Sequence, residues 1–310
     1  MRIVVALGGN ALLRRGERPD AAVQQVNADR AVTALAALAR DNELVITHGN
    51  GPRIGPRIGP LAVGGATDLA LAPPCPLDVL SAQTQGVIGS LLVRALRDAL
   101  PGRQVAALVT HTVVRADDPA FERPTEFVGQ AHSREVAHAL ARERGWHIAK
   151  DTTGWRRVVP SPTPEAVVEA DTVHALLSSG TLVVCAGGGG VPVTADRGTG
   201  GLTTVEAVVD KDLTAALLAE ELKADLLLIL TDVPNVYADF GTARQQPVLD
   251  VTPAQLRDGA FSEGSMKPKA EAAARFVERT GGLAAIGALD AAYAIAHGTS
   301  GTLVRPELAL

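Results

Sequence analysis

The feature that most constrains the fold is a regular alternation of short apolar, β-branched runs with longer Ala- and Leu-rich stretches. The apolar runs are predicted to be buried strands at 3–7, 44–47, 105–114, 181–186, 225–230 and 283–287. The longer stretches are predicted to be helices at 21–40, 81–100, 164–178, 211–223 and 268–279. This alternation is typical of an α/β protein whose mostly parallel sheet carries helices on both faces.

Two stretches depart from the alternation. Residues 115–157 are polar and rich in Asp, Glu, Arg and His, so we expect an excursion from the sheet there. The Pro-rich run 160–164 then stiffens the chain before it rejoins the sheet. The unit Gly-Pro-Arg-Ile occurs twice within 51–60, which indicates an elaborated loop rather than a repeat architecture.

Composition excludes several classes of protein. The 310 residues are enough for two lobes, and the net charge of -5 gives no basic field for a nucleic-acid backbone. The two cysteines form neither a disulfide framework nor a zinc motif. No apolar run reaches the roughly 20 residues that span a bilayer, and the first run is too short for a signal peptide. We therefore expect a cytoplasmic protein that binds neither nucleic acid nor membrane.

Three glycine-rich turns follow predicted strands. They are Gly-Gly-Asn at 8–10, His-Gly-Asn-Gly-Pro at 48–52 and four consecutive glycines at 187–190. Glycine lets backbone N–H groups approach an anion closely, and ligands of such folds bind at the carboxyl ends of the strands. The chain has neither a P-loop nor a Rossmann glycine motif. The turns thus predict an anion site of another kind, although each alone is also compatible with a plain tight turn.

Lysine is rare in this chain. Five lysines stand against 24 arginines, so each lysine is a candidate for work that a planar guanidinium does not do. Lys211 opens a predicted helix between two carboxylates, and Lys267 and Lys269 open another. A cation at a helix N-terminus opposes the helix dipole, and an anionic ligand there offsets that cost. The alternative for each is an ordinary surface lysine.

Seven segments, in order between residue 3 and about residue 304, resemble those of carbamate kinases, which belong to the amino acid kinase family. They are Gly-Gly-Asn-Ala-Leu at 8–12, His-Gly-Asn-Gly-Pro at 48–52, Trp-Arg-Arg-Val-Val-Pro-Ser-Pro at 155–162, Gly-Gly-Gly-Gly-Val-Pro-Val at 187–193, Val-Glu-Ala-Val-Val-Asp-Lys-Asp-Leu at 205–213, Thr-Asp-Val at 231–233 and Gly-Ser-Met-Lys-Pro-Lys at 264–269.

The resemblance implies the amino acid kinase fold, an open three-layer αβα sandwich. It implies an acceptor lobe over 1–204, with the excursion at about 115–157, and a nucleotide lobe over 205–310. It also implies a homodimer and the reversible reaction of ATP with carbamate to give ADP and carbamoyl phosphate. Mg²⁺ would be held mainly by the nucleotide phosphates, with no side-chain metal site of its own.

The resemblance also assigns roles to residues. Lys211 and Lys269 would neutralise the moving phosphoryl group, and Asp212 and Asp210 would orient these lysines. The residues expected to bind the acceptor and the transferred group are Gly8, Gly9, Asn10, Gly49, Asn50 and Gly51. Those expected on the nucleotide side are Thr231, Asp232, Tyr237, Met266 and Lys269.

One position departs from the family pattern. Carbamate kinases typically carry Pro-Thr-Lys in the excursion, whereas this chain has Pro-Thr-Glu at 124–126. Glu126 thus reverses the charge of an active-site lysine, which Arg123 or Arg134 could replace. Two alternatives to a carbamate kinase follow: a kinase of the same fold for another small acid or phosphate acceptor, and a catalytically weak nucleotide-binding paralogue. Retention of Lys211, Asp212 and Lys269 argues against the second.

Overall fold

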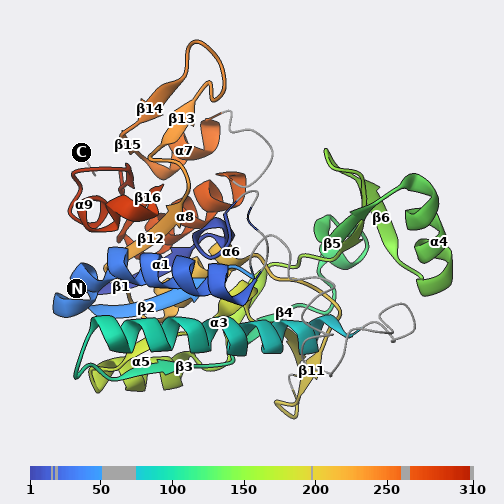
Figure 1. Ribbon diagram of the computed structural model, residues 1–310, viewed down its shortest axis with the longest axis horizontal. Helices are drawn as coiled ribbons and strands as arrows, with labels where there is room; N and C mark the ends of the chain where they lie inside the picture. The colour runs from blue at the N-terminus through green and yellow to red at the C-terminus, as the bar shows by residue number, and fades with distance from the viewer. Residues whose placement is uncertain (15–16, 18–19, 51–74, 197, 260–265, 308–310) are drawn as a thin grey trace.

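A computed structural model describes residues 1–14, 17, 20–50, 75–196, 198–259 and 266–307 (Figure 1). Gly51, the doubled unit at 51–60, and residues 264 and 265 of the last motif lie outside the described residues. Everything that follows concerns the described ranges.

The main sheet is eight-stranded and almost entirely parallel. Its order is β15 (Asp250–Val251), β17 (Thr302–Val304), β16 (Leu283–Ala288), β12 (Leu226–Thr231), β1 (Arg2–Leu7), β2 (Glu43–His48), β9 (Leu182–Val184) and β3 (Val105–Ala107). Only the β16–β17 pairing is antiparallel among these neighbours. The predicted mostly parallel sheet is confirmed.

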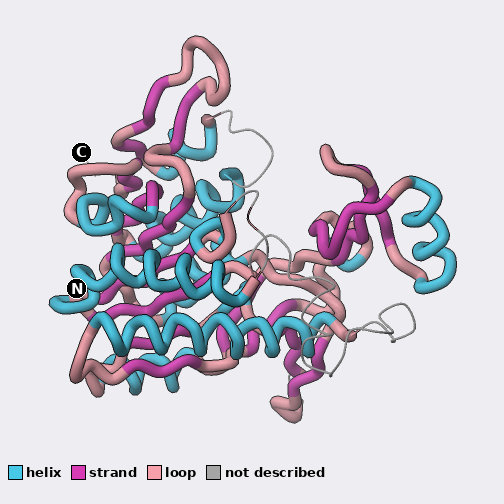
Figure 2. Tube along the Cα trace, in the orientation of Figure 1, coloured by secondary structure: helices cyan, strands magenta, loops and turns pink. Residues whose placement is uncertain are grey.

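Both faces of this sheet are covered by helices, because side chains of each buried strand alternate between two apolar cores. Ile3 and Val5 of β1 face one core, and Val4 and Ala6 face the other. The first core includes side chains of α1 (Ala21–Asp41), α3 (Leu77–Ala99) and α9 (Ala292–Ala296). The second includes side chains of α5 (Ala170–Ser178), α6 (Lys211–Glu221), α7 (Pro253–Asp258) and α8 (Met266–Thr280). The result is the three-layer αβα sandwich, with helices flanking the strands in Figure 2.

The sequence prediction was wrong at 105–114. That run is not one strand: β3 stays in the main sheet, whereas β4 (His111–Val114) belongs to a second sheet. The break occurs at Thr110, whose backbone N–H and C=O are both bonded to the side-chain amide of buried Gln85, at 3.0 and 3.1 Å. The Gln85 side chain thus takes the N–H group of Thr110 out of strand pairing, while Thr110 O also accepts from Val191 N–H of the second sheet at 2.9 Å.

The prediction of a single helix over 164–178 was also wrong. Residues Pro164–Val167 form β8, which pairs antiparallel with β4, and the helix begins only at Ala170. Val167 donates its backbone N–H to Glu221 at the end of α6, which fixes the strand against the helix layer. The second sheet is completed by β10 (Val191–Ala195) and β11 (Leu202–Thr204).

The polar excursion folds as a separate three-stranded sheet with one helix. Its strands are β5 (Glu126–His132), β6 (His147–Lys150) and β7 (Trp155–Val159), and α4 (Arg134–Arg144) connects β5 to β6. Figure 1 shows it projecting from one side of the sandwich. Two contacts tie its base to the main body: Val208 N–H donates to Pro160 O at 3.0 Å, and Arg157 pairs with Glu206 at 2.9 Å.

The two expected lobes share the main sheet. β1, from the first lobe, lies hydrogen-bonded beside β12, from the second. A hairpin of β13 (Val236–Ala238) and β14 (Gln246–Val248) extends from the second lobe (Figure 1). Neighbouring parallel strands end at the same edge of the sheet, so the turns after β1, β2, β9 and β12 come together there.

Candidate active site

The first two glycine turns meet at this edge in very close contact. Gly8 N–H donates to Leu230 O of β12 at 2.9 Å, and Gly49 N–H donates to Leu7 O of β1 at 3.0 Å. A Cβ on Gly49 would lie 3.0 Å from Gly9 N and 3.2 Å from Lys211 Cδ. A side chain here would have to push the Gly9 backbone or the Lys211 stem aside, which favours glycine at this position.

Lys211 and Lys269 converge on one buried carboxylate. Lys211 Nζ lies 2.6 Å from Asp212 Oδ1, and Lys269 Nζ lies 3.0 Å from Asp212 Oδ2. The Asp212 side chain is only 2% exposed. Lys211 and Asp212 begin α6, and Lys269 lies in the first turn of α8, so two helix starts place two ammonium groups beside the glycine turns.

The electrostatics of Asp212 follow from this geometry. Burial alone raises the pKa of its carboxyl, but the two ammonium groups outweigh burial and hold the pKa below its usual range. Asp212 therefore stays ionised and fixes both lysines. The Asp210 carboxylate caps α6 by accepting from the N–H groups of Asp212 and Leu213, both at 2.9 Å, and the charges of Lys211 and Lys269 also act on it. Burial and the charge of Asp212 raise the pKa of Asp210.

Polar side chains from the two expected lobes also meet at this edge. Asn10 Nδ2 donates to Asp232 Oδ2 at 3.0 Å, and Thr231 Oγ1 donates to Asp232 Oδ1 at 3.2 Å. An acceptor-side residue and two nucleotide-side residues predicted from the sequence are therefore in one hydrogen-bonded group.

The remaining two nucleotide-side candidates lie outside this group. Tyr237 is on β13, where its ring packs against Phe240 with centroids 6.0 Å apart. Met266 begins α8 and packs against the apolar core beneath it. Neither side chain has a hydrogen bond to the lysine pair within the described part of the chain.

The third glycine turn, Gly187–Gly189 with Gly190, packs against the second. A Cβ on Gly188, where φ is +62°, would lie 2.1 to 2.4 Å from the amide atoms of Asn50. A Cβ on Gly187 would lie 2.3 Å from the ring of buried His48. Burial lowers the pKa of His48 to about 4, so this ring is neutral at pH 7 and serves as packing.

Sequence reasoning missed the residues that hold this turn. Thr112 Oγ1 and Thr214 Oγ1 both donate to Gly189 O, at 2.6 and 3.2 Å. Thr110 Oγ1 accepts from Ala186 N–H at 2.9 Å and itself donates to Gln85. Isolated threonines and a helical glutamine carry no sequence motif, so no local signal could have identified them.

Glu126, the charge-reversed position, begins β5 opposite Val159 of β7. Glu126 is exposed at the surface, but its carboxyl is partly shielded from solvent. This desolvation and, second, the charge of Asp210 raise the pKa of the carboxyl. Arg156 partly opposes the rise. The positive charge acting on Glu126 thus comes from Arg156, which is already paired with Asp151 at 3.2 Å.

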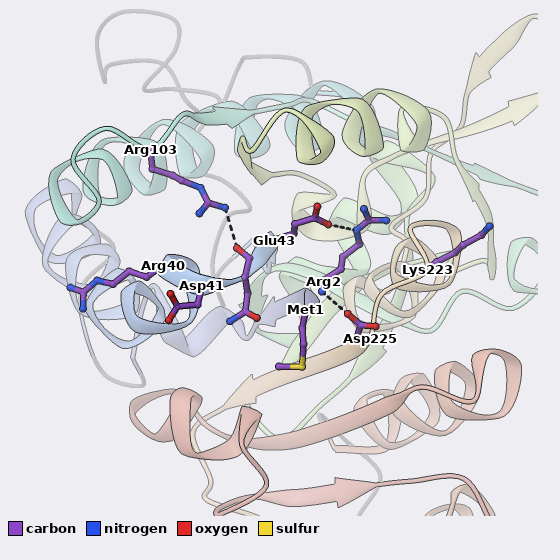
Figure 3. A pocket seen from close by; sticks show the side chains of 9 residues that line it. Met1, Arg2, Arg40, Asp41, Glu43, Arg103, Lys223 and Asp225 are labelled. Atoms are coloured by element: carbon purple, nitrogen blue, oxygen red, sulfur yellow. Dashed lines mark hydrogen bonds and ion pairs between the residues drawn. The ribbon is translucent and has the colours of Figure 1, made fainter.

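Two other charged hollows lie away from this edge. One, of about 570 Å³, lies at the amino-terminal ends of β1 and β2, where Arg2 pairs with Glu43 and Arg103 bonds main-chain carbonyls (Figure 3). The other, of about 780 Å³, lies between the base of the excursion and α8 and includes Arg115 and Arg275. In the first, Arg2 joins Glu43 through its side chain and Asp225 through its backbone N–H, so these contacts tie β1 to β2 and to the start of β12.

Within the described ranges, no three His, Cys, Asp or Glu side chains are grouped as metal ligands. None of the helices described is both long and apolar enough to cross a bilayer.

Comparison with known proteins places the chain in a family. The amino acid kinase family model matches residues 1–286. The carbamate kinase of Haemophilus influenzae is 45% identical over 307 residues, covering 98% of this chain and 96% of that protein. The carbamate kinase of Rhizobium meliloti is 43% identical over 308 residues, covering 98% and 93%.

A solved structure agrees with these sequences. Carbamate kinase from Giardia lamblia bound to AMP-PNP has a TM-score of 0.88 and 32% identity, covering 99% of this chain and 98% of that one. The chain therefore belongs to the amino acid kinase family and is similar to carbamate kinases over nearly its whole length.

Proposed function

We propose that this chain is a carbamate kinase, which transfers a phosphoryl group reversibly between ATP and carbamate. The observation that carries the proposal is the pair of lysine ammonium groups fixed on buried Asp212 beside the glycine turns. The similarity to carbamate kinases over 98% of the chain supports the choice of acceptor.

The chemistry follows from the charges present. In the ATP-forming direction, a terminal phosphate oxygen of ADP attacks phosphorus, the bond from phosphorus to the carbamoyl oxygen breaks, and carbamate leaves. Negative charge spreads over the phosphoryl oxygens as they move, and fixed cations stabilise it. Lys211 and Lys269 supply these cations, and Asp212 holds them in place before the reaction begins.

The substrates are assigned to opposite sides of the lysines. We assign Gly8, Gly9, Asn10, Gly49, Asn50 and Gly51 to carbamate and the transferred group. The N–H groups of Gly8 and Gly49 already donate to strand carbonyls, so these two glycines act by letting the backbone approach the ligand, and Gly9 N–H with the Asn10 and Asn50 amides makes the polar contacts. Thr231, Asp232, Tyr237 and Met266 form the ADP side, and AMP-PNP bound to the Giardia enzyme supports a nucleotide substrate. Mg²⁺ enters with the nucleotide phosphates, since Asp212 is already committed to two lysines.

The larger organisation is also part of the proposal. Residues 1–204 form the acceptor lobe, with the excursion, and 205–310 form the nucleotide lobe of a cytoplasmic homodimer. Light scattering should give a particle of twice the 32.0 kDa chain mass, and a monomer mass would contradict the dimer alone.

A panel of phosphoryl donors tests the function. We expect ATP from MgADP and carbamoyl phosphate at a rate well above that with other acyl or alkyl phosphates. Turnover of a different donor instead would favour a kinase of the same fold that acts on another acceptor. The observation that motivates this alternative is Glu126, which stands where carbamate kinases typically have a lysine. Thermal stabilisation by ADP with no turnover of any donor would favour a non-catalytic paralogue.

A further inference from the structure

Asn50 lies at the meeting point of the first two glycine turns. It follows Gly49, where an added Cβ would lie 3.0 Å from Gly9 N and 3.2 Å from Lys211 Cδ. The plane of the Asn50 amide packs on the backbone of Gly188: a Cβ added to Gly188 would lie 2.1 Å from Oδ1 and 2.2 Å from Nδ2. The side chain thus packs on the third glycine turn, one residue after the glycine that approaches the Lys211 stem.

The amide oxygen of Asn50 is buried without a hydrogen-bond partner in the described part of the chain. A buried acceptor left without a hydrogen bond destabilises the fold, so an atom of this kind in a native protein calls for a specific explanation. A bound group that donates a hydrogen bond removes this cost.

The other polar groups at the acceptor side mostly donate. The two lysines are donors, and the Nδ2 group of Asn10 donates to Asp232, whereas the N–H groups of Gly8 and Gly49 are already bonded to strand carbonyls. The lysines suit the phosphoryl and carbonyl oxygens of an acyl phosphate. A carbamoyl group carries in addition an NH₂, which needs an acceptor.

We propose that Asn50 Oδ1 accepts a hydrogen bond from the amino group of carbamate and carbamoyl phosphate, and so discriminates against acyl phosphates that carry a methyl group instead. Because Gly188 has no side chain, the amide packs directly on its backbone. The Cβ–Cγ torsion of Asn has broad minima, so a modest rotation presents the oxygen to the ligand. This inference rests on the proposed function and adds the origin of its substrate specificity.

The experiment compares carbamoyl phosphate with acetyl phosphate, which differs by CH₃ in place of NH₂, as phosphoryl donors to MgADP. The readout is the ratio of kcat/KM for the two donors, measured for the wild type, Asn50→Leu and Asn50→Asp. Leu keeps the branched shape of Asn but has no acceptor, and we expect the ratio to fall on the order of 10- to 100-fold. Asp keeps an acceptor oxygen, so it should lower both rates, because its charge opposes the phosphate, while retaining the preference for carbamoyl phosphate.

Asn10→Leu is the matched control, since it removes the neighbouring amide whose nitrogen already has a partner. It should lower turnover of both donors with little change in their ratio. An unchanged ratio in Asn50→Leu, or a lost preference in Asn50→Asp, would overturn the role of Oδ1. If the wild type turned over neither donor, the proposed function itself would fail, which is a different result.

Discussion

Asp212 shows how a single residue organises the site. Its carboxylate is nearly inaccessible to solvent, yet it remains ionised because two ammonium groups contact its two oxygens. Replacing one partner of such a buried group leaves uncompensated charge, so the three side chains act as a unit. The rarity of lysine was enough to predict that Lys211 and its neighbour Asp212 belong to the site. The contact of Lys269 with the same carboxylate depends on the fold and could not be predicted from that rarity.

Glu126 is the residue whose replacement tests the charge balance of the site. Its carboxylate adds negative charge near Asp210, so Glu126→Gln and Glu126→Lys should lower the KM for carbamoyl phosphate, with roughly ten-fold improvement for Lys. The pKa of Glu126 is raised, so at low pH its carboxyl is neutral and wild type and Gln variant should converge. Their difference should grow as pH rises through the raised pKa.

Steady-state kinetics across pH checks this expectation, with Glu122→Lys as a control on an exposed position of the same excursion. A loss of turnover in both Glu126 variants would mean that the carboxylate is part of a re-tuned site. Such a result would favour the alternative acceptor.

At the scale of elements, the alternation of apolar runs was enough to predict most of the main sheet and its covering helices. The approximate positions of β1, β2, β9, β12 and β16 followed from the sequence because fully buried parallel strands are continuous apolar runs. The break between β3 and β4 could not be predicted from the sequence, because it depends on Gln85, which lies on α3, 25 residues before Thr110 in the chain. Long-range side-chain bonds of this kind leave no local pattern.

The end of α6 provides a test of stability. Glu221 accepts from Val167 N–H, and burial raises the pKa of its carboxyl to about 7. The folded state holds this proton more tightly than the unfolded state. The stability that protonated Glu221 contributes is therefore fully present below the unfolded pKa. It is lost as pH rises from about 4.5 to about 7.

Glu221→Gln, which cannot ionise, should therefore match the wild type near pH 4 and be more stable at pH 8. The expected gain is about 1 kcal/mol after allowance for solvent screening, or about 2–4 °C in Tm. Calorimetry at the two pH values measures it, with exposed Glu122→Gln as the control. Equal differences from wild type at both pH values would contradict the assignment.

At the scale of the whole molecule, one sheet edge gathers segments that are far apart in the sequence. The turns after β1, β2 and β9 and the starts of α6 and α8 meet there, and Asn10 bonds Asp232 across the two lobes. The excursion is tied near the same edge through Val208 and Glu206, just before α6. The motifs could be predicted as one site because parallel strands end together, whereas their side-chain contacts required the folded chain.

The most direct measurement is ATP formation from MgADP and carbamoyl phosphate by the wild type, Lys211→Met and Lys223→Met. Lys223 is exposed and lines the hollow at the opposite edge of the sheet, so it controls for loss of a lysine as such. We predict full activity in Lys223→Met and a loss of at least about 100-fold in Lys211→Met, with an unchanged far-UV spectrum. Comparable ATP formation by Lys211→Met and the wild type would contradict the central claim that fixed lysine charge on Asp212 drives phosphoryl transfer.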